Sequence, residues 1–295
     1  MSYPSPLFSQ TEKNLINLIN STSQFTWNNC IYDVIKASKP ATSRGECKTD
    51  VFIKTLQGNF KISIKQSNAD FLENKISYER AKQIFGDDTD SILRSSIGTI
   101  EQSFQNHPLI CFKKMGRTEE KTILLGWKFE LLNKKGGDKS GVLQLTDEQK
   151  LNVYSGHLLS SDKRNASVDG QVIADSGVAD YILEIDEVSG HDLQFYINKL
   201  KPIWDFSRQQ TIYFACKALN YRSLVDKWDG DRPLAVYVDW YLHQGELKSS
   251  ICYDQPLQVK GNVVGNRVRE ILNELNITSD NFDELKEYYF GNTYP

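Results

Sequence analysis

The segment from 51 to 66 constrains the fold of this chain more than any other part, because its order of apolar, turn-forming and alternating residues predicts a β-hairpin. The stretch VFIKTL (51–56) is apolar and β-branched, QGN is typical of a turn, and FKISIKQ (60–66) alternates strictly. Successive side chains of a strand point to opposite faces. The polar face of the second strand therefore carries Lys61, Ser63 and Lys65.

Antiparallel pairing of these strands brings three reactive groups together. With a turn centred on Gly58, paired residues have numbers that sum to about 116, so Asp50 falls opposite Gln66 and diagonal to Lys65. A carboxylate, a hydroxyl and an ammonium group then converge. Hydrolysis of a phosphodiester needs a divalent cation and a second cation that holds the attacking water. Asp50 suits the first task and Lys65 the second.

The residues GECKTD (45–50), followed by SIK (63–65), resemble the signature of the PD-(D/E)XK nuclease superfamily. In that family an Asp begins one strand, an acid-x-Lys triplet lies on the adjacent strand, and both face one Mg²⁺ site. The resemblance implies an α/β fold with a restriction endonuclease-like core, which is a mixed central sheet flanked by helices. It also implies an additional α+β region for recognition.

The resemblance assigns roles to four residues of the hairpin. Asp50 takes the place of the first metal ligand and Lys65 that of the catalytic lysine. Ser63 takes the place of the second acid, although it supplies no negative charge, and the backbone carbonyl of Ile64 can reach the metal. The implied cofactor is Mg²⁺, for which Mn²⁺ substitutes.

A further carboxylate is needed to complete such a site, and two candidates are present. Glu46 lies four residues before Asp50, and Glu12 lies in the first predicted helix, where the family often places an acidic residue. We include Glu46 among the catalytic candidates. The alternative is a surface hairpin whose Lys61, Ser63 and Lys65 form only a solvated face.

Apolar periodicity predicts mixed α and β structure along the rest of the chain. Helices are expected at 10–20, 26–38 and 76–86 and over most of 192–219, and buried strands at 122–132 and 233–242. We expect a nuclease core at 1–115. The region 116–295 then supplies DNA recognition and dimerisation, and can complete the core sheet.

The formal charge of −3 gives no general attraction to nucleic acid, so phosphate contacts depend on local clusters. Candidates for DNA contact lie near the hairpin, in the Gly-rich loop at 133–141 and in the segment 220–233. They are Arg44, Lys48, Lys61, Gln66, Lys134, Lys135, Tyr221, Arg222 and Arg232. Solvated charges and ordinary loop packing are the alternative explanation.

Several other classes of site lack support in the sequence. The five cysteines are scattered without a CxxC pair, and the four histidines show no metal-binding spacing. The acidic run at 176–187 is interpreted as the edge of a strand or the end of a helix. Neither a signal peptide nor a long apolar stretch is visible, which predicts a cytoplasmic protein without a membrane partner.

The leading hypothesis is a type II restriction endonuclease that cleaves double-stranded DNA as a homodimer, with a cognate DNA methyltransferase encoded nearby. One alternative is a repair, recombination or phage nuclease of the same fold. Another is a non-catalytic nucleic-acid-binding protein that has lost the second acid at Ser63.

Overall fold

The computed structural model describes residues 6–43, 45–67, 70–74 and 76–295. The chain divides into two compact units, each assembled from two segments: unit 1 is Met1–Asp70 with Leu145–Gln210, and unit 2 is Phe71–Gln144 with Thr211–Pro295. The boundary expected at 115 therefore falls inside unit 2. The segment that follows residue 144 returns to the hairpin unit, because its strands extend the hairpin sheet.

Unit 1 is built on a six-stranded sheet with the order β1-β2-β3-β4-β11-β12. Its strands are β1 (Gln24–Trp27), β2 (Cys30–Ser38), β3 (Val51–Thr55), β4 (Asn59–Lys65), β11 (Tyr181–Glu184) and β12 (Lys201–Pro202), with a separate pair β9 (Ser167–Val168) and β10 (Gln171–Val172). Its helices are α1 (Pro6–Asn20), α5 (Asp147–Ser155), α6 (Ser161–Arg164), α7 (Leu193–Ile197) and α8 (Ile203–Arg208). Strand β11 runs parallel to β4, whereas the other neighbours are antiparallel, so the sheet is mixed.

The hairpin predicted at 51–66 is confirmed, but its register differs from the prediction. Val51 pairs with Ile62 and Lys54 with Asn59, and the Thr55 N–H donates to the Gly58 carbonyl at 3.0 Å. The corner is therefore formed by the two residues before Gly58, rather than centred on it. Continuing the register by one residue places Asp50 opposite Ser63 instead of Gln66.

The helix predicted at 26–38 is wrong, because this segment forms the hairpin of β1 and β2. Asn28 and Asn29 both have positive φ, 49° and 62°. Two such residues in succession make the tight turn whose twist matches that of a hairpin. The β-branched and aromatic residues that follow them favour an extended strand.

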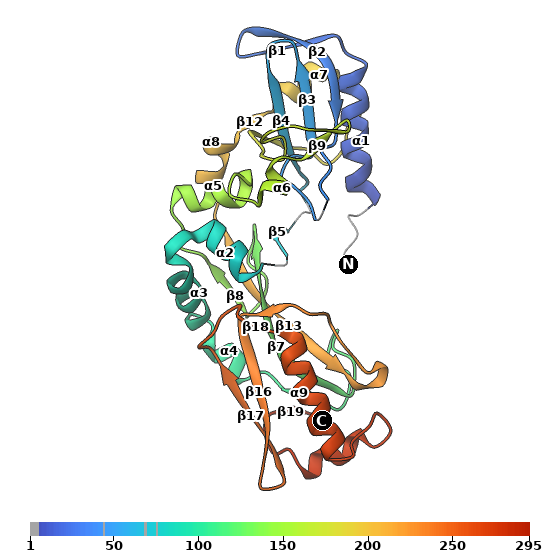
Figure 1. The fold of residues 1–295 in the computed structure, drawn as a ribbon, viewed down its shortest axis with the longest axis vertical. Helices are drawn as coiled ribbons and strands as arrows, with labels where there is room; N and C mark the ends of the chain where they lie inside the picture. The colour runs from blue at the N-terminus through green and yellow to red at the C-terminus, as the bar shows by residue number, and fades with distance from the viewer. Residues whose placement is uncertain (1–5, 44, 68–69, 75) are drawn as a thin grey trace. The chain divides into compact units, whose positions relative to one another are not determined.

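The core of unit 1 lies between α1 and one face of the sheet (Figure 1). Leu15 and Ile19 of α1 are fully buried, as the helical stripe predicts. They belong to the same apolar cluster as Val51, Ile62 and Ile64. Because the side chains of a strand alternate, Asp50 and Ser63 belong to the opposite set from this core.

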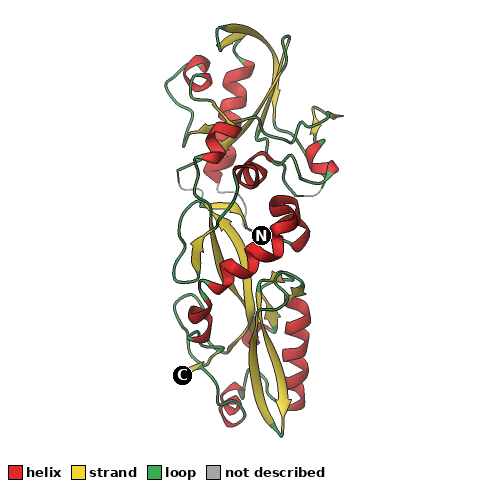
Figure 2. Ribbon diagram, turned by 90° about the vertical axis from the view of Figure 1, so that its left-hand side faces the viewer, coloured by secondary structure: helices red, strands yellow, loops and turns green. Residues whose placement is uncertain are grey.

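Unit 2 contains a nine-stranded sheet with the central order β14-β13-β7-β16-β17. Its strands are β5 (Phe71–Glu73), β6 (Ile110–Cys111), β7 (Thr122–Leu132), β8 (Ser140–Val142), β13 (Tyr213–Arg222), β14 (Lys227–Trp228), β16 (Val236–His243), β17 (Glu246–Cys252) and β19 (Thr293–Tyr294), beside the pair β15 (Pro233–Leu234) and β18 (Val259–Lys260). Its helices are α2 (Tyr78–Phe85), α3 (Thr89–Gly98), α4 (Glu101–Gln105) and α9 (Gly261–Glu274), with short 3-10 turns η1 (Gly86–Asp88), η2 (Ser223–Val225) and η3 (Phe282–Glu287). Helix α9 packs against β16, β7 and β13, and Figure 2 shows it beside the long strands.

The predicted strands at 122–132 and 233–242 are confirmed, and α2 ends before Gly86 as expected. The helical prediction for 192–219 is correct only in its first part. Helices α7 and α8 are present, but Tyr213–Arg222 is a strand whose residues pair with β7 along its length. Phe214, Ala215 and Cys216 are buried in succession, so the first half of this strand lacks the alternation that marks a half-exposed strand.

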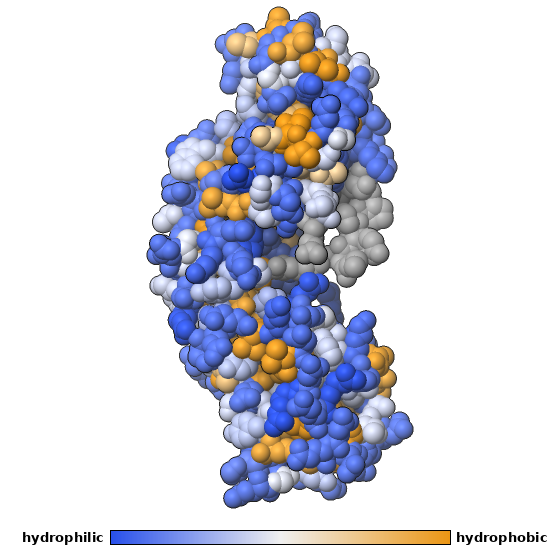
Figure 3. All heavy atoms as spheres, in the orientation of Figure 1, coloured by the Kyte–Doolittle hydropathy of each residue, from blue (hydrophilic) through white to orange (hydrophobic). Residues whose placement is uncertain are grey.

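Polar side chains cover most of the face drawn in Figure 3, and apolar ones form separate small patches. None of the cysteines forms a disulfide; Cys111 and Cys216 are buried, whereas Cys30 is exposed. In the described ranges no helix has both the length and the apolar character that a bilayer crossing requires.

Candidate functional site

Asp50 lies immediately before β3 and is held by hydrogen bonds to residues of the neighbouring strand β4. Its N–H donates to the Ile62 carbonyl at 2.8 Å, which extends the strand pairing. Its carboxylate Oδ2 accepts from the Ile64 N–H at 2.7 Å and from the Ser63 hydroxyl at 3.3 Å. The hairpin therefore orients the carboxylate through the two residues that precede Lys65 in the SIK triplet.

Burial is the largest influence on the Asp50 carboxyl and raises its pKa. The positive charge of Lys65, the hydrogen bond from Ile64 and the charge of Lys39 all act in the opposite direction. Ser63 is buried, with 1% of its surface exposed, so its hydroxyl faces Asp50 and not solvent. The structure thus brings Asp50, Ser63 and Lys65 together, as the sequence predicts, although the pairing register differs.

A second carboxylate comes from Glu12 of α1, which is buried with 3% exposure. One oxygen of Glu12 is ion-paired with Lys39, and Oε1 has no hydrogen-bond partner. Burial raises the pKa of Glu12, the hydrogen bond from Lys39 lowers it, and the negative charges of Asp50 and Glu46 raise it further. These influences show that Glu12 lies within electrostatic range of Asp50.

Lys39, which follows β2, is the residue that sequence reasoning missed at this site. Burial lowers the pKa of its ammonium group, but the hydrogen bond and charge of Glu12, with the charges of Asp50 and Glu46, raise it overall. Glu46 itself is exposed and lies in the loop before β3. No local pattern marks Lys39, because its partner Glu12 is distant in sequence.

The oxygen atoms at this site fit a hard divalent cation better than a soft metal. Within the described part of the chain, no three His, Cys, Asp or Glu side chains gather as a ligand cluster. Mg²⁺, however, is usually held by one or two carboxylates and keeps several waters. Asp50 and Glu12 provide two carboxylates, and the unpartnered Oε1 of Glu12 is a buried acceptor that a cation would satisfy.

Gln66, at the end of β4, links the elements that carry these acids. Its side-chain amide donates to the Thr11 hydroxyl at 3.2 Å and to the Asp186 carbonyl at 3.0 Å, and Thr11 donates to the same carbonyl at 2.9 Å. Gln66 is buried, with 8% exposure. It therefore holds α1 beside β4, in the wall of a 370 Å³ pocket that includes Ser67 and Asp186.

The acidic residues at 176–187 have separate partners. Asp180 is ion-paired with Lys61 at 3.2 Å, and Glu184 is ion-paired with Lys201 at 2.5 Å. Asp186 accepts hydrogen bonds from the backbone and hydroxyl of Ser67, which lower its pKa. These acidic side chains link β11 to neighbouring segments, in agreement with the interpretation of this run as a strand with acidic residues at its ends.

The predicted DNA-contact residues are widely distributed. Lys61 and Gln66 are engaged inside unit 1, Tyr221 is buried against Asp226, and Arg222 is ion-paired with Asp229 and Glu119. Lys134 and Lys135 are exposed in unit 2, whereas Arg232 of unit 2 and Lys48 of unit 1 are partly buried. Arg44 lies outside the described residues.

Comparisons of the chain with protein-family models, with curated proteins and with solved structures found no match. The interpretation of the site therefore depends on its geometry.

Proposed function

We propose that this protein is a Mg²⁺-dependent endonuclease that hydrolyses DNA phosphodiester bonds. The observation that carries the proposal is the meeting of Asp50, Ser63 and Lys65 at the end of one hairpin, with Glu12 within electrostatic range. The mixed sheet of unit 1, with α1 on one face, is consistent with the core that the PD-(D/E)XK resemblance implies.

The chain's own residues divide the chemistry between them. The carboxylates of Asp50 and Glu12 and the carbonyl of Ile64 would hold the cation. When bound, Mg²⁺ would neutralise charge on the phosphate and supply hydroxide. Lys65 would hold the attacking water and stabilise the developing negative charge, since its ammonium group lies within electrostatic range of Asp50. Ser63 would keep Asp50 oriented through its hydrogen bond.

Within this function, we favour a type II restriction endonuclease. Unit 2 adds a complete sheet and helix layer that strand cleavage does not require, and a symmetric DNA site is read most simply by a two-fold dimer. Double-stranded DNA as substrate, the homodimer, a DNA methyltransferase encoded nearby and a cytoplasmic location belong to this proposal. The alternative is a repair, recombination or phage nuclease that catalyses the same reaction.

Ser63 favours one further candidate, a nucleic-acid-binding protein without catalysis. Its buried hydroxyl stands where the family resemblance calls for a second acid. Calorimetric titration with Mn²⁺ in the presence of DNA separates the two functions, since the non-catalytic protein would bind DNA without taking up metal.

Incubation of the purified protein with phage DNA and Mg²⁺, followed by sequencing of the fragment ends, tests the proposal. Discrete ends at a recurrent sequence are expected for a restriction enzyme, and scattered ends or ends at structural features for the alternative nucleases. Intact DNA across a range of divalent metals would reject catalysis.

A further inference from the structure

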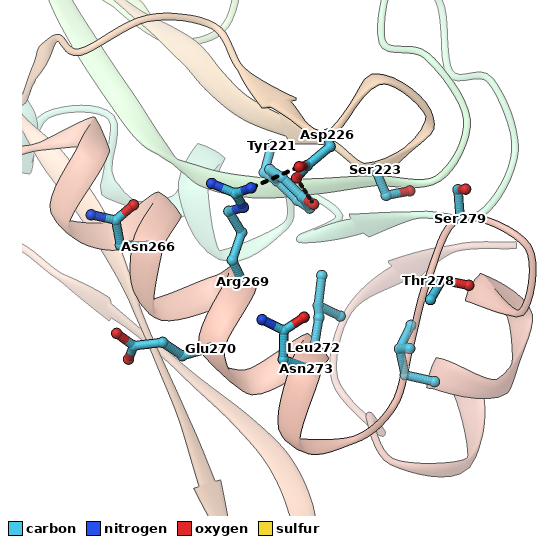
Figure 4. Close-up of a pocket in the computed structure, with 11 residues that line it drawn as sticks. Tyr221, Ser223, Asp226, Asn266, Arg269, Glu270, Leu272, Asn273, Thr278 and Ser279 are labelled. Atoms are coloured by element: carbon cyan, nitrogen blue, oxygen red, sulfur yellow. Dashed lines mark hydrogen bonds and ion pairs between the residues drawn. The ribbon is translucent and has the colours of Figure 1, made fainter.

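Unit 2 contains a pocket of 480 Å³ beside helix α9 (Figure 4). One wall comes from the end of β13 and the turn after it, and the other from α9. The side chains that carry the argument are Tyr221, Ser223, Asp226, Asn266, Arg269 and Asn273. Small-molecule sites usually measure roughly 300 to 1,000 Å³, so this volume accepts one small molecule or one group of a larger ligand.

The charged residues of the pocket neutralise one another. Arg269 is ion-paired with Asp226 at 2.7 Å, and the Tyr221 hydroxyl donates to the other oxygen of Asp226 at 2.8 Å. Glu270 at the rim is ion-paired with Arg267 of the same helix at 3.5 Å. Among the described lining residues, no cation is left to bind an anion, so the pocket does not favour a phosphate.

The groups that are left for a ligand are amides above an apolar floor. Among the described residues, the side chains of Asn266 and Asn273 have neither a hydrogen-bond partner nor an ion pair. Leu272 and Ile277, both buried, add aliphatic surface. Asparagine is a weak helix former, and positions that sacrifice local stability are often functional. Figure 4 shows Asn273 across from the Tyr221–Asp226 pair.

We infer that this pocket binds a single nucleobase. A base combines flat apolar faces with an edge of adjacent donors and acceptors, and an asparagine amide pairs with such an edge through two hydrogen bonds. That the base belongs to a DNA substrate rests on the proposed function. In a duplex, that base would first leave the stack. Because the charges in the lining are balanced by ion pairs, the pocket selects the base and leaves its phosphate outside.

The test uses the full chain and four free nucleosides, without metal and without cleavage. Adenosine, guanosine, cytidine and thymidine are titrated at millimolar concentrations while the side-chain amide resonances of Asn266 and Asn273 are followed by NMR. Inorganic phosphate and methyl glucoside serve as counter-probes. The variant Asn273→Leu removes the amide at similar volume, and Glu274→Leu places leucine at an exposed position of α9 outside the pocket lining.

At least one nucleoside is expected to shift both amides. Its affinity should fall roughly tenfold or more in Asn273→Leu and stay unchanged in Glu274→Leu. Absence of nucleoside shifts, shifts by glucoside or phosphate alone, or equal affinity in Asn273→Leu would overturn the inference. Because no DNA is cut in this experiment, failure to bind nucleosides leaves the nuclease proposal standing. Conversely, a protein that binds nucleosides but does not cleave DNA would support the base pocket and reject the nuclease activity.

Discussion

The substitution Ser63→Asp places a second carboxylate beside Asp50. In the wild type, the Ser63 hydroxyl lies 3.3 Å from Asp50 Oδ2 and is buried. Two negative charges separated by roughly 4 Å repel by about 4 kcal/mol at an effective dielectric constant of about 20. Lys65 and Lys39 offset part of this repulsion, since both stabilise the charged form of Asp50. We therefore expect a net cost of about 2 kcal/mol in the metal-free protein.

A divalent cation would relieve this repulsion, because it would bind both carboxylates. The same 2 kcal/mol then appears as Mn²⁺ affinity that is roughly 30-fold higher in Ser63→Asp than in a neutral variant of equal size. Ser63→Asn is that control, since its side chain has the shape of aspartate without the charge.

The assay measures unfolding of both variants in chelator and in Mn²⁺, together with calorimetric Mn²⁺ titration. Ser63→Asp should be less stable than Ser63→Asn in chelator and should gain more stability from Mn²⁺. Equal stabilities and equal Mn²⁺ affinities would refute the reasoning, because residue 63 would then not share a metal site with Asp50.

Three further predictions concern the hydrogen bonds of Gln66, the raised pKa of Asp50 and the salt dependence of DNA binding. Gln66→Met should lower the free energy of unfolding by about 1 to 3 kcal/mol and weaken Mn²⁺ binding, since it removes the amide that donates to Thr11 of α1 and to the Asp186 carbonyl; the exposed Gln102→Met is the matched control, and equal losses in both variants would contradict this role. Because burial raises the pKa of the Asp50 carboxyl, its contribution to stability is present below its unfolded pKa and is lost as the pH rises through its folded pKa. Asp50→Asn should therefore be more stable than the wild type in chelator at pH 7. This advantage should shrink as the pH falls through the raised folded pKa of Asp50 towards its unfolded value of about 4, as denaturant titration at several pH values can show; a pH-independent difference would argue against a raised pKa. DNA affinity measured in Ca²⁺ should fall steeply between roughly 50 and 200 mM salt, and salt-independent binding would argue against phosphate contacts.

How far the sequence predicts this structure depends on the range of the interactions involved. The β3–β4 hairpin follows from alternation within one short segment, so its existence and its polar face were predictable. Its register depended on which residues form the corner, and Gly58 lies just after the corner instead of at its centre. Turn residues alone do not distinguish these two arrangements.

The local sequence pattern did not predict the β1–β2 turn, strand β13 or the Glu12–Lys39 ion pair. Two consecutive asparagines, Asn28 and Asn29, were the overlooked sequence signal for the β1–β2 turn, because asparagine tolerates positive φ better than most residues. Strand β13 follows two short helices after a polar run at 207–211 that contains neither glycine nor proline, so no local signal marks the change from helix to strand and only its pairing with β7 identifies it. The Glu12–Lys39 ion pair joins α1 to the end of β2, and such a contact exists only once the sheet has formed.

The direct test of the central claim is Mg²⁺-dependent cleavage of plasmid DNA by the wild type and three variants. Asp50→Asn and Lys65→Met should each reduce the rate by roughly 10² to 10³ or more, because each removes a charge that acts mainly in the transition state. Lys54→Met, at an exposed position of the same hairpin, should cleave at the wild-type rate. Cleavage by Asp50→Asn or Lys65→Met at the rate of Lys54→Met would contradict the assignment of this hairpin as the catalytic site.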